Sequence, residues 1–179
     1  MNDEFEVVPI ERTLYFAYGS NMNVGQMMFR CPDAQRVETV RLEDYRLAFR
    51  TNGGGNGVAT VLPEPGSHVT GVLWRISERD EERLDLYEGF PILYGKEPVM
   101  VKSHDGRSME VIAYTINPPY RDVPALPSPT YLEGILNGCR QNGLSLRLVR
   151  EAVERTRQEP MPEEIHPQKR VRLKNDRER

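Results

Sequence analysis

Tyr18, Gly19, Ser20 and Asn21 are consecutive residues whose types could hold an anion. They end an apolar run rich in β-forming residues, and the segment 21–30 that follows has the apolar spacing of a helix. A strand that turns into a helix at such a point leaves backbone N–H groups without partners, with the positive end of the helix dipole behind them. Gly19 lets a ligand approach the backbone closely, and the side chains of Ser20 and Asn21 can cap the helix or bond the ligand. The segment therefore predicts a cradle for a carboxylate or phosphate, while a plain strand-turn-helix connection explains the same residues.

Length and composition indicate a single globular domain. The chain has 179 residues, of which 38% are hydrophobic and 28% charged, and no apolar run approaches the length of a membrane span. The net charge of −3 does not indicate the basic surface that nucleic-acid binding requires. The acidic residues 1–6 argue against a secretory or transit peptide, and two cysteines without framework spacing, Cys31 and Cys139, indicate packed thiols in a reduced compartment. We therefore expect a soluble cytoplasmic protein.

The N-terminal half of the chain has the pattern of short strands around one helix. The expected elements are a strand at 13–18, the helix at 21–30, strands at 34–42 and 45–50, a glycine-rich loop at 51–57, and strands at 58–62 and 69–76. Turn residues separate the strands of each pair, Glu43-Asp44 in the first and Pro63-Glu64-Pro65-Gly66 in the second. In the helix, Met22, Met27 and Met28 are expected to face the core. The glycine-rich loop lacks the Lys-Ser/Thr of a P-loop, so a mobile hairpin loop is favoured over a phosphate site.

The C-terminal half adds three helices and two strands. Ser77 and Asp80 form a capping box that opens a helix ending at Glu88-Gly89. The remaining elements are strands at 97–102 and 109–116, a proline-rich crossing at 117–129, a helix from Ser128-Pro129 to Asn142, and a helix capped by Ser145 that runs to about Thr156. We expect a leader at 1–12, one domain at 13–156 and a polar, flexible tail at 157–179. About seven strands and four helices without βαβ alternation predict an α+β fold, with a mixed or mostly antiparallel sheet closing into a small β-barrel with flanking helices.

Several motifs, in this order along the chain, resemble the γ-glutamylcyclotransferase family. They are Tyr18-Gly19-Ser20-Asn21-Met22, Leu84-Asp85-Leu86-Tyr87-Glu88-Gly89, Ser128-Pro129-Thr130-Tyr131 and Asn142-Gly143-Leu144. The resemblance covers about residues 14–154 and is most specific in the combination of the first two motifs. It implies a small α+β fold with a barrel-like core, a cavity beside the loop 18–21, a glutamate acting as acid and base, and no metal or cofactor. It also implies a small-molecule γ-glutamyl substrate.

Glu88 matches the position of that glutamate. A γ-glutamyl compound cyclises when its own α-amine attacks its γ-carbonyl, which forms 5-oxoproline and expels an amine or amino acid. The amine is mostly protonated at neutral pH, with a reference pKa of about 8, so a carboxylate must accept its proton and later pass it to the leaving nitrogen. A solvated surface carboxylate is the alternative for Glu88. The helix dipole disfavours a carboxylate at a helix C-terminus, however, so something must offset that cost.

The remaining candidates would bind the substrate. The backbone N–H groups of the segment 18–21 suit the α-carboxylate, and a backbone N–H of the same loop is a candidate donor for the oxyanion. By the resemblance, Tyr94 and Tyr131 line the cavity, although half-buried structural tyrosines explain them equally well. His68, His104 and His166 lack metal-ligand spacing, and we assign them no function.

Three functions fit these residues. The first is the cyclisation of a γ-glutamyl amine or peptide to 5-oxoproline, with Glu88 as general acid and base. The alternatives are a non-catalytic module that binds a small carboxylate on the same fold, and transfer of the γ-glutamyl group to another acceptor. No nucleic acid or membrane is expected as a partner, since the basic cluster 169–174 is diluted by acidic neighbours, and a homodimer is compatible with the chain.

Overall fold

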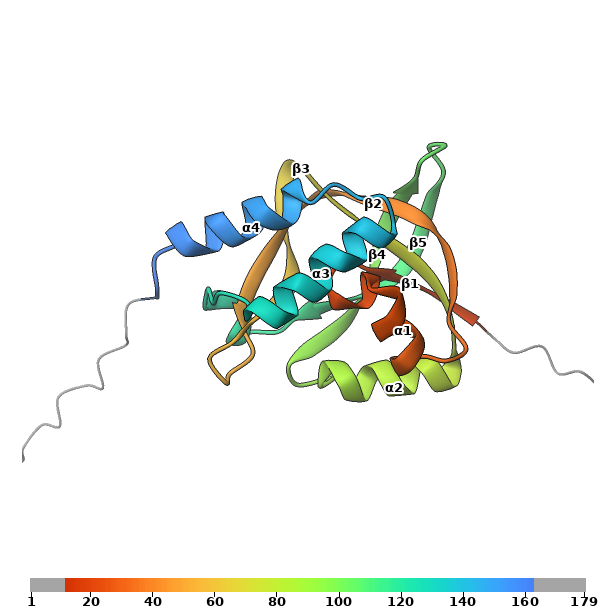
Figure 1. Ribbon diagram of the computed structural model, residues 1–179, viewed down its shortest axis with the longest axis horizontal. Helices are drawn as coiled ribbons and strands as arrows, with labels where there is room; N and C mark the ends of the chain where they lie inside the picture. The colour runs from red at the N-terminus through yellow and green to blue at the C-terminus, as the bar shows by residue number, and fades with distance from the viewer. Residues whose placement is uncertain (1–11, 163–179) are drawn as a thin grey trace, which may run out of the picture.

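Five strands close into a barrel in the computed structural model of the chain, which describes residues 12–162 (Figure 1). The strands are β1 (Arg12–Ala17), β2 (Gln35–Thr51), β3 (Gly57–Ser77), β4 (Tyr94–Ser103) and β5 (Ser108–Ile116). Their order around the barrel is β1-β3-β2-β4-β5. All neighbours are antiparallel except β1 and β5, which close the barrel in parallel through Tyr15 and Ile112. The predicted α+β class with a mostly antiparallel barrel is confirmed.

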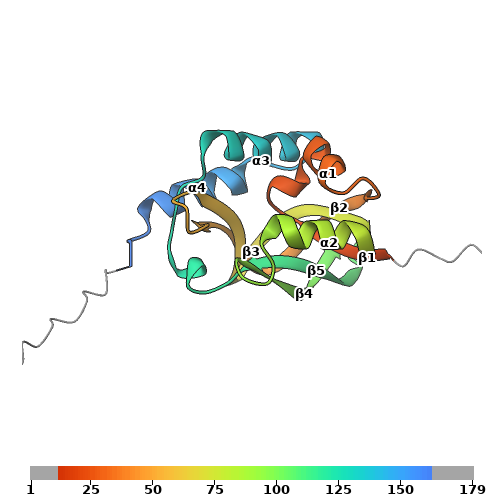
Figure 2. The same cartoon turned by 90° about the horizontal axis from the view of Figure 1, so that it is seen from below.

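Helices flank this barrel. The described part of the chain contains α1 (Val24–Arg30), α2 (Glu78–Glu88), α3 (Pro129–Gln141), α4 (Arg147–Gln158) and the short 3-10 helices η1 (Ser20–Met22) and η2 (Tyr120–Asp122). Figures 1 and 2 show α1 and α3 side by side, and α4 lies along β2. Gly138 permits the contact of α3 with the start of α1, because a Cβ there would lie 2.7 Å from the backbone nitrogen of Asn23. The fold thereby holds the segment 18–23 between the barrel and α3.

Two predicted turns lie inside long strands. Glu43-Asp44 belongs to β2, and the Pro63–Gly66 segment belongs to β3, so four short strands of the prediction are two long ones. The two strands pair over nearly their whole length, with a register shift between Glu43 and Tyr45. Asp44 adopts a φ of 61°, and its Oδ1 accepts a hydrogen bond from the N–H of Gly66 at 2.9 Å. The prediction is wrong here because the turn residues form an irregularity that bends two paired strands, as barrel closure requires, instead of reversing the chain.

The helix boundaries agree with the sequence at most ends. Ser77 and Ser128 cap α2 and α3 as predicted, and their side chains accept the N–H of Asp80 and Tyr131. The helix expected at 21–30 is divided, because Asn23 has an extended backbone and caps α1.

Three details of the helical segments differ from the prediction. Met28 is 40% exposed, whereas Met22 and Met27 are buried as expected. Residue 147 begins α4, and Ser145 accepts the Arg147 N–H one position before the cap. The helix extends to Gln158, two residues beyond the expected domain end.

The predicted leader and tail fall largely outside the described residues. Arg12 already belongs to β1, and residues 157–158 belong to α4. The boundaries at 12 and 156 otherwise stay predictions, as does the basic cluster 169–174. Within residues 12–162, no helix combines the length and apolar character needed to cross a bilayer.

Candidate active site

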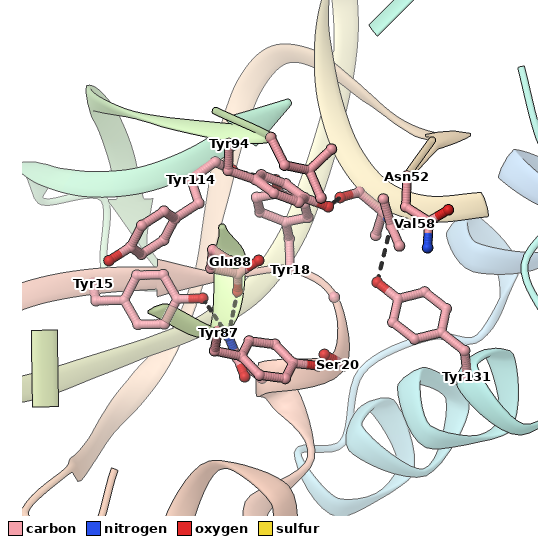
Figure 3. Close-up of a pocket in the computed structure, with 14 residues that line it drawn as sticks. Tyr15, Tyr18, Ser20, Asn52, Val58, Tyr87, Glu88, Tyr94, Tyr114 and Tyr131 are labelled. Carbon is pink, nitrogen blue, oxygen red and sulfur yellow. Dashed lines mark hydrogen bonds between the residues drawn. The ribbon is translucent and has the colours of Figure 1, made fainter. Parts of the chain in front are cut away.

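A cavity of about 220 Å³ lies beside the segment 18–21, the C-terminal end of α2 and the start of β3 (Figure 3). The residues that line it are Tyr15, Tyr18, Gly19, Ser20, Asn21, Asn52, Val58, Ala59, Tyr87, Glu88, Leu93, Tyr94, Tyr114 and Tyr131. Pockets for drug-sized ligands measure about 300–1,000 Å³, so this cavity suits a smaller molecule. Its walls combine tyrosine rings with a single carboxylate.

The segment 18–21 enters the cavity because β1 ends at Ala17 and the chain turns immediately into η1. Within residues 12–162, the backbone N–H groups of Gly19, Ser20 and Asn21 have no hydrogen-bond acceptor, whereas the Met22 N–H donates to the Gly19 carbonyl. A Cβ on Gly19 would lie 3.1 Å from the Cβ of Ala59, so a larger residue would crowd the opposite wall. The segment therefore offers adjacent donors to a ligand.

Glu88 points into the cavity from the last turn of α2 (Figure 3). The helix stops there because Gly89 adopts the left-handed conformation, with a φ of 65°, and donates its N–H to the Asp85 and Leu86 carbonyls. The carboxylate is partly buried and accepts a hydrogen bond from Asn21 Nδ2 at 3.0 Å. Burial raises its pKa from 4.5 to about 7, against the smaller lowering effects of the Arg30 charge and the Asn21 hydrogen bond. A carboxyl with this pKa can both accept and donate a proton near neutral pH.

Asn21 is held on three sides. Arg30 Nη1 donates to its Oδ1 at 2.5 Å, and Trp74 Nε1 donates to its backbone carbonyl at 3.1 Å. Its Nδ2 donates both to Glu88 Oε1 at 3.0 Å and to the Tyr15 hydroxyl at 2.9 Å. The guanidinium of Arg30 is itself fixed, since its Cζ lies 3.8 Å from the ring centroid of Tyr87. The side chain that contacts Glu88 is thus rigidly placed.

Two tyrosines of the opposite wall bind the backbone of Ala59. The Tyr94 hydroxyl donates to the Ala59 carbonyl at 2.6 Å, and the Tyr131 hydroxyl accepts the Ala59 N–H at 3.1 Å. Burial is the main cause that raises the pKa of both tyrosines, so both remain neutral at physiological pH. They reach the cavity from β4 and α3, which lie far apart in the sequence.

Tyr18 and Tyr114 complete the wall next to Glu88. The Tyr18 hydroxyl donates to the backbone carbonyl of Tyr114. The Tyr114 hydroxyl donates to Asp85 Oδ1 at 2.6 Å, and Lys96 pairs with the other oxygen of Asp85 at 3.0 Å. Both hydroxyl hydrogens are therefore already bound by the protein.

Comparison with known proteins relates this site to a family. The family profile described as gamma-glutamyl cyclotransferase, AIG2-like, matches residues 15–133. The chain belongs to this family. Proteins named gamma-glutamylcyclotransferase from Bos taurus and Homo sapiens are each 34% identical to it over 143 aligned residues, and each match covers 76% of this chain and 74% of the relative.

Solved structures agree with this membership. One described as gamma-glutamyl cyclotransferase matches with a TM-score of 0.68 at 29% identity, covering 86% of this chain and 90% of its own. A human protein described as uncharacterized matches with a TM-score of 0.70 at 31% identity and the same coverage. The family resemblance seen in the sequence is confirmed, and the barrel is the one found in these relatives.

All seven residues predicted for the site line the cavity of this gamma-glutamyl cyclotransferase family member: Tyr18, Gly19, Ser20, Asn21, Glu88, Tyr94 and Tyr131. The fold brings them together from the connection between β1 and η1, from η1 itself, and from α2, β4 and α3. Their roles stay predictions.

Several residues of the site were not predicted from the sequence, and four of them carry polar groups that matter here. Tyr15, Asn52 and Tyr114 line the cavity, and Arg30 lies behind Asn21. One clue to Arg30 is its position four residues after Gln26, whose Oε1 accepts from Arg30 Nη2 at 2.9 Å, although the spacing alone does not tell which way that helix face points. The glycine-rich loop joins paired strands as a hairpin and carries Asn52 to the cavity.

The other candidate groups lie elsewhere. His68 and His104 do not line the cavity, and His166 is outside the described residues. No group of three or more His, Cys, Asp or Glu side chains in residues 12–162 is arranged to hold a metal ion. Cys31 and Cys139 are buried free thiols, and burial raises the pKa of Cys31 to about 12.

Proposed function

We propose that this protein converts the γ-glutamyl group of a γ-glutamyl amine or peptide into 5-oxoproline and releases the amine. The observation that carries the proposal is the Glu88 carboxylate, which faces a small cavity beside the unpaired N–H groups of Gly19, Ser20 and Asn21. Membership of the gamma-glutamyl cyclotransferase family and the names of the curated relatives support the same activity.

The reaction uses groups that the substrate already contains. The α-amine forms a bond to the γ-carbon, and the carbonyl electrons move onto oxygen. Glu88 accepts a proton from the attacking nitrogen and returns it to the leaving nitrogen as the old C–N bond breaks. The second proton that the starting α-ammonium group loses also ends on the released amine, which departs as ammonium. Because nucleophile and electrophile belong to one molecule, the protein must mainly hold them in contact, and such intramolecular reactions reach effective molarities of about 10⁵–10⁸ M. The scheme needs no enzyme nucleophile, metal or cofactor.

The proton transfer matches the environment of Glu88. A base with a pKa of about 7 is largely ionised at slightly alkaline pH, yet it gains a proton readily enough to protonate a departing nitrogen. A solvated glutamate with the ordinary pKa of 4.5 would be a much weaker base toward an ammonium group of pKa about 8. Burial of Glu88 therefore has a catalytic consequence.

We assign the α-carboxylate of the substrate to the backbone donors of the segment 18–21. Oriented backbone N–H groups bind a carboxylate without a cation, and Ser20 adds a hydroxyl next to them. In this arrangement the γ-glutamyl chain folds back toward Glu88, and the leaving amine extends along Tyr94 and Tyr131. Its chemical identity is the part of the substrate that the motifs leave open.

The test is a panel of γ-glutamyl amino acids, γ-glutamyl amines and γ-glutamyl peptides, with chromatographic measurement of 5-oxoproline. We expect 5-oxoproline and the free amine in equal amounts from at least one class, and its loss in Glu88→Gln. Tight binding of a small carboxylate without turnover would instead identify a binding module. Free glutamate or a new γ-glutamyl product would identify transfer to water or to another acceptor.

We further propose that the protein acts in the cytoplasm on small molecules, without a nucleic-acid or membrane partner. Two buried free thiols and a net charge of −3 support this setting. We expect a homodimer, which light scattering at several protein concentrations would detect. A particle of about 41 kDa, twice the 20.6 kDa chain, would support it, and a single 20.6 kDa species would refute it.

A further inference from the structure

Six tyrosines line the cavity, and one of them, Tyr87, is 47% exposed and stacks on Arg30. The hydroxyls of the other five tyrosines fall into two groups by what happens to their hydrogen. Tyr18, Tyr94 and Tyr114 each donate it to a protein oxygen. Tyr15 and Tyr131 instead accept a hydrogen bond, and neither hydroxyl hydrogen has an acceptor within residues 12–162. These two tyrosines can therefore donate to a ligand without breaking a protein hydrogen bond.

The role of Tyr15 as an acceptor follows from Arg30. An arginine side chain can only donate hydrogen bonds, so the atom of Asn21 that contacts Arg30 must be the amide oxygen. The NH₂ group of Asn21 consequently faces the other way, and its two hydrogens go to Glu88 Oε1 and to the Tyr15 oxygen. The orientation of one amide thus leaves the Tyr15 hydrogen free.

That hydrogen lies next to the reacting groups of the proposed reaction. Tyr15 is 4% exposed and lines the cavity, and its oxygen shares the Asn21 nitrogen with Glu88 at 2.9 and 3.0 Å. The two acceptors of one planar NH₂ group lie about 5 Å apart. A carbon that carries both the attacking nitrogen and the carbonyl oxygen fits between them, with the nitrogen toward Glu88 and the oxygen toward Tyr15.

We propose, on the basis of the proposed function, that the Tyr15 hydroxyl donates a hydrogen bond to the γ-carbonyl oxygen as it becomes an oxyanion. When the α-amine bonds to the γ-carbon, the carbonyl electron pair moves to this oxygen, and Tyr15 stabilises the charge while keeping its own proton. Collapse restores the C=O bond, breaks the bond to the leaving nitrogen, and draws the proton from Glu88. Tyr15 thereby acts as the oxyanion donor and Glu88 as the proton carrier.

The surroundings of Tyr15 suit this task. Burial and the nearby Glu88 charge raise the pKa of Tyr15 well above its usual range, so it stays protonated at neutral pH. Its ring is fixed by edge-on packing against Tyr114, with centroids 5.7 Å apart, and its backbone pairs with Trp74 of β3. A donor that is fixed before the reaction needs no reorganisation when charge develops on the substrate.

The test is steady-state kinetics of Tyr15→Phe with a γ-glutamyl substrate that the wild type cyclises. Removal of a single oxyanion donor lowers kcat by about 10²–10³-fold in a well-studied case, and we expect a loss of about 10²-fold with KM changed less than about threefold. Tyr45→Phe is the matched control, since Tyr45 is half-buried on β2 outside the cavity, and we expect wild-type kinetics. A Tyr15→Phe kcat within threefold of this control would overturn the proposal.

Two further measurements separate chemistry from structure. In a Glu88→Gln background, calorimetry should give the same substrate affinity with and without Tyr15→Phe, and a large loss of affinity would mean that Tyr15 binds the ground state. The midpoint of the acid limb of kcat/KM should be the same in Tyr15→Phe and wild type. If Tyr15 only positioned Asn21, its replacement would change the environment of Glu88 and shift this midpoint.

If Tyr15→Phe unfolds, the protein is instead made with 3,5-difluorotyrosine at position 15. The fluorinated phenol is more acidic, so an alkaline fall in kcat should move to lower pH, and an unmoved profile would contradict a required Tyr15 proton. Normal 5-oxoproline release with an unimpaired Tyr15→Phe would reject only the Tyr15 assignment. Absence of wild-type 5-oxoproline with every substrate would reject both proposals.

Discussion

Replacement of Glu88 by glutamine removes a partly buried negative charge, so we expect the variant to be more stable than the wild type although it is inactive. Glutamine keeps the size of the side chain, and its amide oxygen can still accept the hydrogen bond from Asn21 Nδ2. The substitution therefore tests the charge with little change in packing.

The magnitude follows from the pKa of Glu88. This pKa is about 7 in the folded protein, against 4.5 ordinarily. At about 1.4 kcal/mol per pH unit, the shift sets an upper limit of about 3 kcal/mol on the unfolding free energy that Glu88→Gln can gain. Partial exposure of the carboxylate to water reduces this figure, and we expect a gain of about 1–3 kcal/mol above pH 7. For a domain of this size, each kcal/mol raises Tm by about 2–4 °C.

The sign depends on pH in a defined way. Between pH 4.5 and about 7 the folded protein binds more protons at Glu88 than the unfolded chain, so this residue makes the wild type less stable as pH rises. Below pH 4.5 both states are protonated and the penalty disappears. The stability advantage of Glu88→Gln should therefore be small near pH 5 and complete near pH 8.

The assay is urea unfolding of wild type, Glu88→Gln and Glu82→Gln at pH 5 and pH 8. Glu82 is an exposed residue of the same helix, and its substitution controls for general changes in helix charge. Equal stability of the two variants at both pH values would refute the argument that Glu88 carries the cost of burial. Retention of 5-oxoproline release by Glu88→Gln would separately refute its catalytic role.

Three further predictions concern Arg30 behind Asn21, the ion pair of Arg50 with Glu159, and the close packing of Gly71. Arg30→Gln should move the acid limb of kcat/KM to higher pH, because loss of the nearby positive charge raises the pKa of Glu88; pH-rate profiles measure this, and an unchanged midpoint would contradict it. Glu159→Gln should destabilise the protein by about 2–4 kcal/mol in denaturant unfolding, since it removes the carboxylate that lies 2.6 Å from the buried Arg50; a change below about 0.5 kcal/mol would show that the pair contributes little. Gly71→Ala should lower Tm sharply because its Cβ would lie 2.3 Å from the Ala17 carbonyl oxygen, whereas Gly25→Ala, whose Cβ has 3.6 Å to its nearest neighbour, should fold normally; similar Tm values for both would reject this packing argument.

Local sequence determined the ends of elements and the motif residues. Ser77 and Ser128 predicted helix starts, and Gly89 predicted a helix end, because capping depends on residues within a few positions. The same local chemistry identified Gly19 to Asn21 as a donor segment. Glu88 was found through its motif together with its unfavourable position at a helix C-terminus.

Tertiary structure decided where local chemistry was ambiguous. Asp44 and Gly66 have turn-forming types, yet pairing of β2 with β3 converts their segments into a bend within two continuous strands. Met28 has the same character as Met27 but is exposed, since one helix face alone contacts the core.

The site shows the same division most clearly. The sequence shows that a carboxylate stands at position 88 and an amide at position 21. The raised pKa of Glu88, however, arises from burial by segments that lie far apart in the chain. Likewise, no sequence pattern indicates that Arg30 turns the Asn21 amide so that Tyr15 keeps a free hydrogen. Residue type depends on the chain alone, whereas pKa and hydrogen-bond direction depend on neighbours that only the closed barrel brings into contact.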